Sequence, residues 1–230
     1  MLMNKAKEFL KDTISDISHQ LKTPLAALAM YQEIIESEPE NAETVKQFAA
    51  KMGISLKRME QLILSMLKIT RLDTGNIIFE KKSCRVSELI AHSVNELTAR
   101  AKNENKQIQI DGDGEQKLIC DMEWTGEAIG NIVKNALDHT QVGGIVRITW
   151  NRAPAMFQIF ISDNGSGIAP EDIHHIFKRF YRSKHSIDTQ GIGLGLPLAK
   201  SIIEGQGGVI SVQSESGKGT LFTLSFLTEL

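Results

Sequence analysis

The first third of the chain repeats apolar residues at a heptad-like spacing, with polar residues between them. One such series runs from Leu10 to Ile35 and a second from Val45 to Ile69, and Ser37–Asn41 interrupts the pattern. This spacing predicts two helices of about 30 residues each, joined by a turn into an antiparallel hairpin, and Arg71–Gly75 is expected to end the second helix. Because a helix pair with one apolar seam on each arm cannot bury those seams well alone, we expect two hairpins to pair into a dimeric four-helix bundle, and therefore a homodimer.

The rest of the chain alternates short apolar runs with helical patterns. Ten of the 18 glycines lie between Asp163 and Thr220, whereas residues 1–74 hold only Gly53. This contrast predicts a helical part followed by an α/β part, so the expected fold class is α + α/β. The expected helices are Ser87–Ala101 with Ser87 as N-cap, Glu123–His139 and Leu194–Gly205; the expected strands are Lys106–Asp111, Lys117–Cys120, Gly144–Trp150, Met156–Ser162 and a pair ending near Leu227.

Composition and charge narrow the classes of protein to consider. With 41% hydrophobic and 23% charged residues the chain is an ordinary globular protein. The net charge of −2 does not indicate a nucleic-acid partner. No apolar run approaches the roughly 18 residues of a membrane span. Cys84 and Cys120 lack a CxxC spacing, which indicates reduced, inert residues of an intracellular protein.

One histidine of the first predicted helix takes an outward heptad position. His19 therefore faces solvent, and an exposed neutral imidazole is a competent nucleophile near pH 7. Pro24 lies inside the same helix, where it removes the hydrogen bond to the carbonyl of Gln20 and costs about 3 kcal/mol. The helix is thus loosened one turn beyond the histidine. The side chains expected on the same face are Asp16, Lys22 and Thr23. A surface histidine without a function is the alternative.

Two segments of the second part carry polar groups suited to a nucleotide. Asn131, Asn135 and His139 share one face of a predicted helix, and amide oxygens suit a hard cation such as Mg²⁺ that carries phosphates. The DNGSGI segment begins at Asp163, after an apolar strand. A carboxylate there can accept a hydrogen bond from an exocyclic amine such as that of adenine, and the glycines let the backbone turn. A polar helix face and a plain strand-to-helix turn are the alternatives.

Three further segments of the second part are candidates for contacts with a nucleotide. The GIGLGL run at Gly191–Leu196 precedes a helix, and its backbone N–H groups could hold phosphate. It does not follow a strand, so a dinucleotide fingerprint is a poor explanation. Gly217–Thr220 could be only a hairpin turn, and Phe177–Arg182 only an amphipathic surface. Each signal is modest alone, whereas their joint occurrence in this order is specific.

The ordered set resembles the cytoplasmic core of a two-component sensor histidine kinase over nearly the whole chain. SHQLKTP is similar to the H-box, NIVKNALDHT to the N-box, DNGSGI to the G1 box, IFKRFYR to the F-box, GIGLGL to the G2 box and GKGT to the last glycine box. The resemblance implies a dimerisation and histidine-phosphotransfer hairpin over residues 1–75. Residues 76–82 would be the linker between the two domains. They lie within a longer connecting stretch, without a predicted helix or strand, that extends to Arg85. An ATP-binding α/β sandwich of the Bergerat type then occupies 83–230.

The resemblance also implies an activity. The protein would use ATP and Mg²⁺ to phosphorylate itself on His19 and would pass the phosphoryl group to an aspartate of a response regulator receiver domain. Phosphatase activity toward that regulator is a further expectation. The chain would be the cytoplasmic portion of a membrane-anchored sensor. The implied catalytic residues are His19, Gln20, Thr23, Asp16 and Arg182. The implied nucleotide contacts are Asn131, Asn135, His139, Asp163, Gly165, Gly167, Ile168, Phe180, Gly191, Gly193, Leu194, Gly195 and Thr220, with Asn135 on the metal and residues 183–190 as an ATP lid.

Two positions depart from the family pattern. Gln20 stands where an acidic residue usually follows the phosphoacceptor, and an amide is no useful base. We hypothesise that Asp16 partly substitutes, or that catalysis is slower. Asp138 stands where a basic residue is usual, and it would repel phosphate if it faced the nucleotide. Lys134 or Lys184 could supply the missing charge.

Two other functions compete with the kinase. A kinase-impaired regulatory dimer that binds or dephosphorylates a response regulator would explain Gln20 and Asp138, but not the intact His19 and glycine boxes. An ATPase-driven clamp like those of gyrases and heat-shock chaperones would need a glutamate four residues before the metal-binding asparagine. Here Asn131 occupies that position, and an amide cannot activate water as a base.

Overall fold

The computed structural model of the chain describes residues 2–183 and 191–228, with side chains of the first helix described at residue 15 and from residue 17 onward. The chain forms two compact units, Met1–Leu67 and Lys68–Leu230. The expected domain limits of 1–75, 76–82 and 83–230 stay a prediction. None of the described helices is long and apolar enough to cross a membrane.

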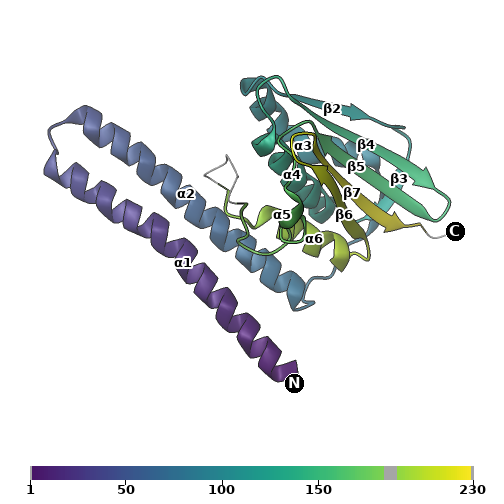
Figure 1. Cartoon of the computed structure of the whole chain (residues 1–230), viewed down its shortest axis with the longest axis horizontal. Coiled ribbons are helices and arrows are strands. Elements are labelled where there is room, and N and C mark those ends of the chain that lie inside the picture. The colour runs from purple at the N-terminus through teal and green to yellow at the C-terminus, as the bar shows by residue number, and fades with distance from the viewer. Residues whose placement is uncertain (1, 184–190, 229–230) are drawn as a thin grey trace. The chain divides into compact units, whose positions relative to one another are not determined.

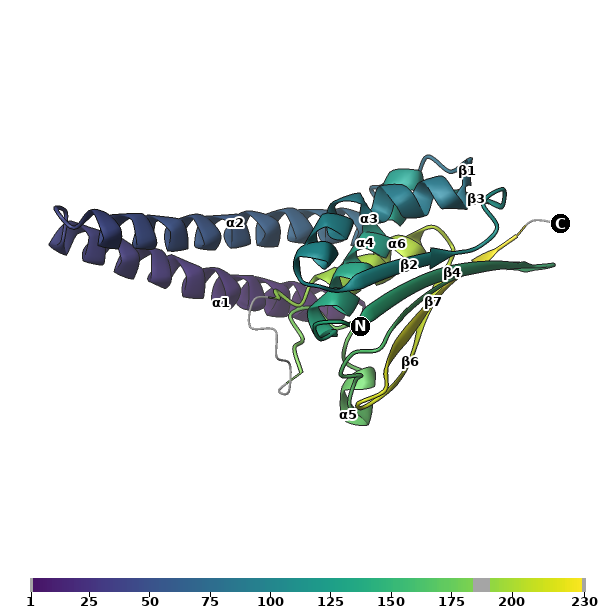
Figure 2. The same cartoon turned by 90° about the horizontal axis from the view of Figure 1, so that it is seen from above.

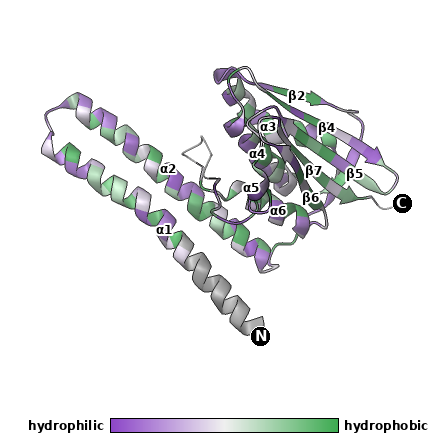
Figure 3. Ribbon diagram, viewed as in Figure 1, coloured by the Kyte–Doolittle hydropathy of each residue, from purple (hydrophilic) through white to green (hydrophobic). Residues whose placement is uncertain are grey.

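The first unit is a helical hairpin, as the heptad pattern predicts. Helix α1 spans Leu2–Ser37 and helix α2 spans Ala42–Asp73, running past the end of the unit (Figure 1). Asn41 caps α2, because its side-chain oxygen accepts a hydrogen bond from the backbone N–H of Thr44 at 3.2 Å. The arms meet where the rings of Tyr31 and Phe48 lie 5.6 Å apart. Both arms carry hydrophobic and hydrophilic residues in alternating bands (Figure 3).

The C-terminal end of α2 belongs to the second unit and stops at a glycine. Gly75 has a left-handed backbone, with φ of 66°. The N–H of Gly75 donates to the carbonyl of Leu72, and that of Asn76 donates to the carbonyl of Arg71, each at 3.1 Å. This pair of bonds is a Schellman motif, which satisfies the last carbonyls of the helix. The predicted end of the second helix at Arg71–Gly75 is therefore confirmed.

The remainder of the second unit is a sheet with helices on one face (Figure 2). Its five strands lie in the order β2-β4-β5-β7-β6, with β2 parallel to β4 and the other neighbours antiparallel. They span Gln107–Asp111 (β2), Ile145–Ala153 (β4), Met156–Asp163 (β5), Val209–Glu215 (β6) and Gly219–Leu227 (β7). The covering helices are α3 (Val86–Asn103), α4 (Met122–His139) and α6 (Gly195–Gly205), and α5 (Pro170–Ile173) is a single turn.

The core lies between the sheet and the helices. Inward residues alternate with outward ones along the central strands, so that Ile159 and Phe222 are fully buried on neighbouring strands. From the other side, α4 presents Ile129 and Ile132, which are also fully buried. This layered core holds the last residues of α4 and β5 in fixed positions, where the polar groups of the predicted nucleotide site lie.

The structure departs from the predicted elements at the entry to this unit. Lys82–Arg85, which we placed in a connecting stretch, forms strand β1, paired antiparallel with β3 (Lys117–Cys120). The prediction of Ser87 as an N-cap is wrong. Helix α3 begins at Val86, whose N–H donates to the carbonyl of Gln116 at 3.0 Å, so backbone pairing starts the helix. The Ser87 hydroxyl instead donates to the carbonyl of Gly114 at 3.0 Å.

The turn between β6 and β7 offers a test of this packing. Gly217 and Gly219 both have left-handed backbones, at φ of 79° and 94°. A β-carbon on Gly217 would meet no atom within 4 Å, whereas one on Gly219 would overlap the carbonyl of Asp163. We expect Gly217→Ala to lower the free energy of unfolding by about 1 kcal/mol and Gly219→Ala to lower it by at least twice as much. Urea denaturation measures both, and equal losses would contradict the close approach.

Candidate functional site

Three predicted nucleotide contacts share one face of α4. Asn131, Asn135 and His139 are all partly buried. The Asn131 amide donates to the carbonyl of Glu127 at 3.0 Å, which orients its oxygen away from its own helix. A β-carbon on Gly195 would lie 3.2 Å from that oxygen, so the first turn of α6 packs against this face. The structure therefore brings the predicted N-box and the second half of the GIGLGL run together.

A carboxylate closes this region at the end of β5. The N–H of Gly165 donates to Oδ1 of Asp163 at 2.9 Å. Burial raises the pKa of Asp163 above its ordinary value, although hydrogen bonds from the backbone N–H groups of Gly165 and Thr220 and the nearby His139 favour the ionised form. The side chain is thus a fixed acceptor at a partly dehydrated position. Such a group can select a ligand by the donor that the ligand presents.

The DNGSGI loop is attached to α4 through its backbone. The N–H of Ser166 donates to the carbonyl of His139 at 3.1 Å. A β-carbon on Gly165 would overlap that same carbonyl, so only glycine lets the loop approach this closely. The end of α4 and the end of β5 are therefore held in contact, which places His139 beside Asp163.

The same loop is attached to the turn between β6 and β7. The N–H of Gly217 donates to the carbonyl of Ser166 at 2.7 Å. Gly167 has a φ of 66°, and a β-carbon there would overlap the carbonyl of Glu215. The predicted G1 box and the GKGT segment thus form one continuous surface, and Thr220 is buried within it.

One residue of this junction escaped the sequence analysis. The hydroxyl of Ser214 accepts a hydrogen bond from the N–H of Ile168 at 2.9 Å and donates to the carbonyl of Gly219 at 2.8 Å. It also lies 3.0 Å from the hydroxyl of Thr220. Ser214 occupies an inward position of β6, in register with the buried Ile210. The sequence signal that could have identified Ser214 is a hydroxyl residue at a strand position where the alternating pattern predicts an apolar residue.

A backbone hydrogen bond joins the described residues on the two sides of the predicted lid. The N–H of Phe180 donates to the carbonyl of Gly193 at 2.9 Å. Phe180 has a left-handed φ of 60°, and a β-carbon on Gly193 would lie 2.8 Å from the carbonyl of Tyr181. Beyond Gly193, Leu194 is buried and precedes α6. Residues 184–190 of the predicted lid, with Lys184, lie outside the described residues.

Two further predicted contacts flank that lid. Arg182 is exposed and Gly191 is partly buried. The hydroxyl of Tyr181 donates to Oδ1 of Asp172. This hydrogen bond raises the pKa of Tyr181, because it favours the protonated phenol. The segment before Arg182 is therefore attached to the single turn of α5.

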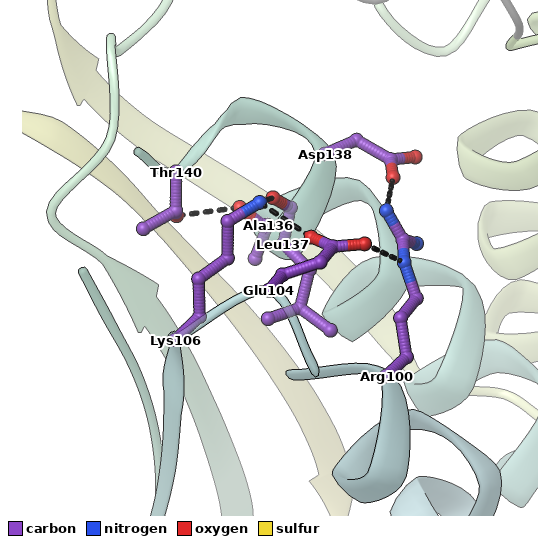
Figure 4. A network of polar contacts seen from close by, with 7 residues as sticks. All are labelled: Arg100, Glu104, Lys106, Ala136, Leu137, Asp138 and Thr140. Carbon is purple, nitrogen blue, oxygen red and sulfur yellow. Dashed lines mark hydrogen bonds and ion pairs between the residues drawn. The ribbon is translucent and has the colours of Figure 1, made fainter. Parts of the chain in front are cut away.

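The structure accounts for the unusual acidic residue of the N-box. Arg100 of α3 donates from Nη2 to Oδ1 of Asp138 at 2.6 Å and from Nε to Oε1 of Glu104 at 2.6 Å (Figure 4). Lys106 donates to the other oxygen of Glu104 at 2.6 Å and to the carbonyl of Leu137 at 2.8 Å. Asp138 is thus neutralised inside a network that closes the last turn of α4. Asp138 therefore does not present an unpaired negative charge that would repel phosphate.

The predicted phosphoacceptor group lies in the first unit. His19 and Thr23 of α1 are exposed and Gln20 is partly exposed. Pro24 is buried and α1 is continuous through it. The side chain of Asp16 lies outside the described residues. Among the residues that the structure describes, no cluster of three or more histidine, cysteine, aspartate or glutamate side chains could hold a metal ion.

Comparison with known proteins assigns both units. Residues 9–75 match the His Kinase A (phospho-acceptor) domain, and residues 120–230 match the histidine kinase-, DNA gyrase B-, and HSP90-like ATPase family. The chain is 30% identical over 217 residues to the sensor-like histidine kinase SenX3 of Mycobacterium tuberculosis, covering 94% of this chain and 53% of that protein. It is also 30% identical over 217 residues to the sensor protein SrrB of Staphylococcus aureus, covering 93% and 37%. The chain therefore spans about half the length of SenX3 and less of SrrB.

Solved structures show the same fold. The histidine kinase AdeS of Acinetobacter baumannii aligns with a TM-score of 0.74 at 18% identity, over 91% of this chain and 97% of that one. The histidine kinase ThkA, solved in complex with the response regulator protein TrrA, aligns with a TM-score of 0.80 at 19% identity, over 98% and 64%. The two matched domains together cover most of this chain, and the chain belongs to the sensor histidine kinases.

Proposed function

We propose that the protein is an ATP-dependent protein-histidine kinase that phosphorylates His19 and passes the phosphoryl group to an aspartate of a response regulator. The observation that carries this proposal is the pairing of two chemical parts in one chain. An exposed histidine lies in the segment that matches a phospho-acceptor domain. A fixed carboxylate with glycine loops around it lies in the segment that matches an ATPase family.

The proposed reaction is a direct displacement. A ring nitrogen of His19 attacks the γ-phosphorus, the bond from that phosphorus to the bridging oxygen breaks, and ADP leaves with the electron pair. The imidazole proton goes to Asp16 if that carboxylate substitutes for the base that Gln20 cannot supply, and otherwise to solvent. The phosphorus–nitrogen bond then breaks when a carboxylate of the receiver domain attacks.

The second unit would hold the nucleotide. In this proposal Asp163 accepts a hydrogen bond from the adenine amine, and the backbone of Gly165–Ile168 and Gly191–Gly195 lies along the ligand. Asn135 would hold Mg²⁺ through its amide oxygen, with Asn131 and His139 beside it, because hard cations prefer oxygen ligands. The ion neutralises charge on the phosphates when bound.

Several remaining roles belong to the same proposal. Arg182 would stabilise charge on the transferred phosphoryl group, a task suited to a fixed guanidinium. Phe180 and Thr220 would border the nucleotide, and Leu194 would position the phosphate-binding start of α6. Thr23, exposed one turn after His19, would orient water if the protein also dephosphorylates its regulator.

Related structures support the ligand and the partner. One neighbour, the full-length kinase ShkA, was solved in complex with AMPPNP, and ThkA was solved with a response regulator. We further propose a homodimer, because the hairpin exposes large apolar side chains, namely Leu25, Met30, Ile54, Leu56, Ile63, Leu64 and Leu67. We also propose that this chain is the cytoplasmic portion of a longer, membrane-anchored protein; the match to 53% of SenX3 supports the greater length.

One observation favours a second function. Gln20 removes the base expected beside the phosphoacceptor, so a kinase-impaired dimer that binds or dephosphorylates a response regulator is the alternative. Asp138 no longer argues for it, because Arg100 neutralises that carboxylate.

The first prediction concerns His19. We expect the native chain with γ-labelled ATP and Mg²⁺ to gain a label that is acid-labile and base-stable, and His19→Ala to gain none, because the imidazole is the nucleophile. His174→Ala is the matched control, since His174 is also exposed and should leave labelling unchanged. If no protein is labelled while ATP still binds, the regulatory dimer replaces the kinase.

The second prediction concerns Gln20. We expect Gln20→Glu to raise the rate of His19 labelling about tenfold, less than the roughly 10²–10⁴-fold of a full general base, because the new carboxylate orients the imidazole and takes its proton. The affinity for ATP should not change. Asp16→Asn should slow labelling in the native chain and have little effect beside Gln20→Glu if Asp16 substitutes for the missing base. A Gln20→Glu rate equal to that of the native chain would refute this account.

The third prediction concerns Asp163. We expect Asp163→Asn to weaken ATP binding about tenfold, the loss of roughly one charge-assisted hydrogen bond. Asp111→Asn, at the exposed end of β2, is the control. Because burial raises the pKa of Asp163 above its ordinary value, the acceptor carboxylate is present at higher pH and is lost by protonation on acidification, earlier than for an exposed aspartate. Calorimetric titration against pH measures this, and a pH profile shared by the native chain and Asp163→Asn would count against the role.

A further inference from the structure

Cys84 and Cys120 are neighbours in the short sheet formed by β1 and β3. In the antiparallel register Cys84 faces Leu118 and Lys82 faces Cys120, so the two cysteines are diagonal neighbours on the same face. Their sulfur atoms lie 3.5 Å apart, and both thiols are free. The cysteines are 36 positions apart in the chain, and the sequence analysis treated each as an isolated, inert residue.

The two thiols differ in exposure and in acidity. Cys84 is partly exposed, whereas Cys120 is 1% exposed. The hydrogen bond with Cys120 lowers the pKa of Cys84, and the same contact together with burial raises the pKa of Cys120. Cys84 is thus the more acidic thiol of the pair as well as the more accessible one. A thiolate is the reactive form of cysteine, so the more accessible sulfur is also the nucleophile.

We propose that Cys84 and Cys120 form a reversible dithiol–disulfide site that responds to hydroperoxides. The Cys84 thiolate attacks the peroxide oxygen, the oxygen–oxygen bond breaks, and Cys84 becomes a sulfenic acid as the leaving oxygen takes a proton to form water. The Cys120 sulfur then attacks the Cys84 sulfur and expels a second water. Starting from the Cys84 thiolate and the Cys120 thiol, the pair loses two electrons and one proton, and with a second proton from solvent, hydrogen peroxide is reduced to two waters.

Formation of the disulfide requires a small movement of the two sulfur atoms toward each other. The sulfur atoms must approach from 3.5 Å to the length of a disulfide bond, about 2.05 Å. Strand β1 has four residues and, among the described strands, pairs with β3 alone. Because β3 places Leu118 and Cys120 in the core, we assign the movement to β1, whose residues are exposed or partly exposed. On the face that carries the cysteines, Lys82 is exposed and Cys84 is partly exposed, so the Cys84 end of the pair is accessible.

The site has a direct connection to the nucleotide helix. Cys120 is followed by Asp121, which caps α4 by accepting from the N–H of Trp124 at 3.2 Å and accepts from the N–H of Glu80 at 2.9 Å. The N–H of Asp121 donates to the side chain of Gln206 at 2.8 Å. Closing the disulfide moves the backbone that carries this cap. Because α4 holds the proposed nucleotide contacts, we expect oxidation to weaken ATP binding, a consequence that rests on the proposed function.

The test treats the reduced chain with hydrogen peroxide and then blocks the remaining thiols with an alkylating agent. Mass spectrometry of the native chain should show an internal disulfide joining the peptides of Cys84 and Cys120, and dithiothreitol should restore both thiols. Cys84→Ser and Cys120→Ser should each prevent it. Two alkylated thiols after peroxide, a disulfide between chains, or sulfinic acid at Cys84 would each overturn the proposal.

A second measurement separates this site from the kinase itself. Binding of ATP is titrated before and after oxidation, with Cys84→Ser as the control that should bind equally under both conditions. An affinity several-fold lower in the oxidised native chain alone supports the coupling. A disulfide that leaves the affinity unchanged overturns the coupling and leaves the kinase proposal intact. Failure of the reduced chain to bind ATP or to label His19 contradicts the proposed function instead.

Discussion

The arrangement of the second unit depends on one place where backbone packs directly against backbone. The loop after Asp163 touches the last carbonyl region of α4 on one side and the turn before β7 on the other, at distances that only glycine allows at residues 165, 167 and 219. Because three elements meet there without side chains between them, their polar groups point into one small region. Helix α4, strand β5 and the β6–β7 turn therefore position each other. A displacement of one of them requires the other two to move.

The sequence predicted the parts of this protein whose pattern is local. The hairpin follows from heptad spacing, the end of α2 from Gly75, and the polar face of α4 from the spacing of Asn131 and Asn135. Each of these signals lies within a few turns of a helix or at one glycine, so a single segment carries the whole information. The glycine boxes were identified by their order along the chain, which the structure then explains as contacts.

What the sequence did not reveal depends on partners that are distant in the chain. Arg100 neutralises Asp138 from 38 positions away, and Ser214 joins the glycine loops from another strand. Strand β1 forms by backbone pairing with β3, so its side chains need no alternating pattern. The contact of Cys84 with Cys120 is of the same kind. Such interactions are set by topology, and no window of residues contains both members.

The left-handed backbone of Phe180 has a consequence for the ends of the predicted lid. A residue with a β-carbon pays about 1–2 kcal/mol to hold that conformation, and here one hydrogen bond to Gly193 accompanies it. The hydrogen bond to Gly193 offsets part of that cost, so the two ends of the predicted lid are held together against the backbone preference of Phe180. A ligand that displaces Phe180 would therefore act on a conformation that the residue itself does not favour.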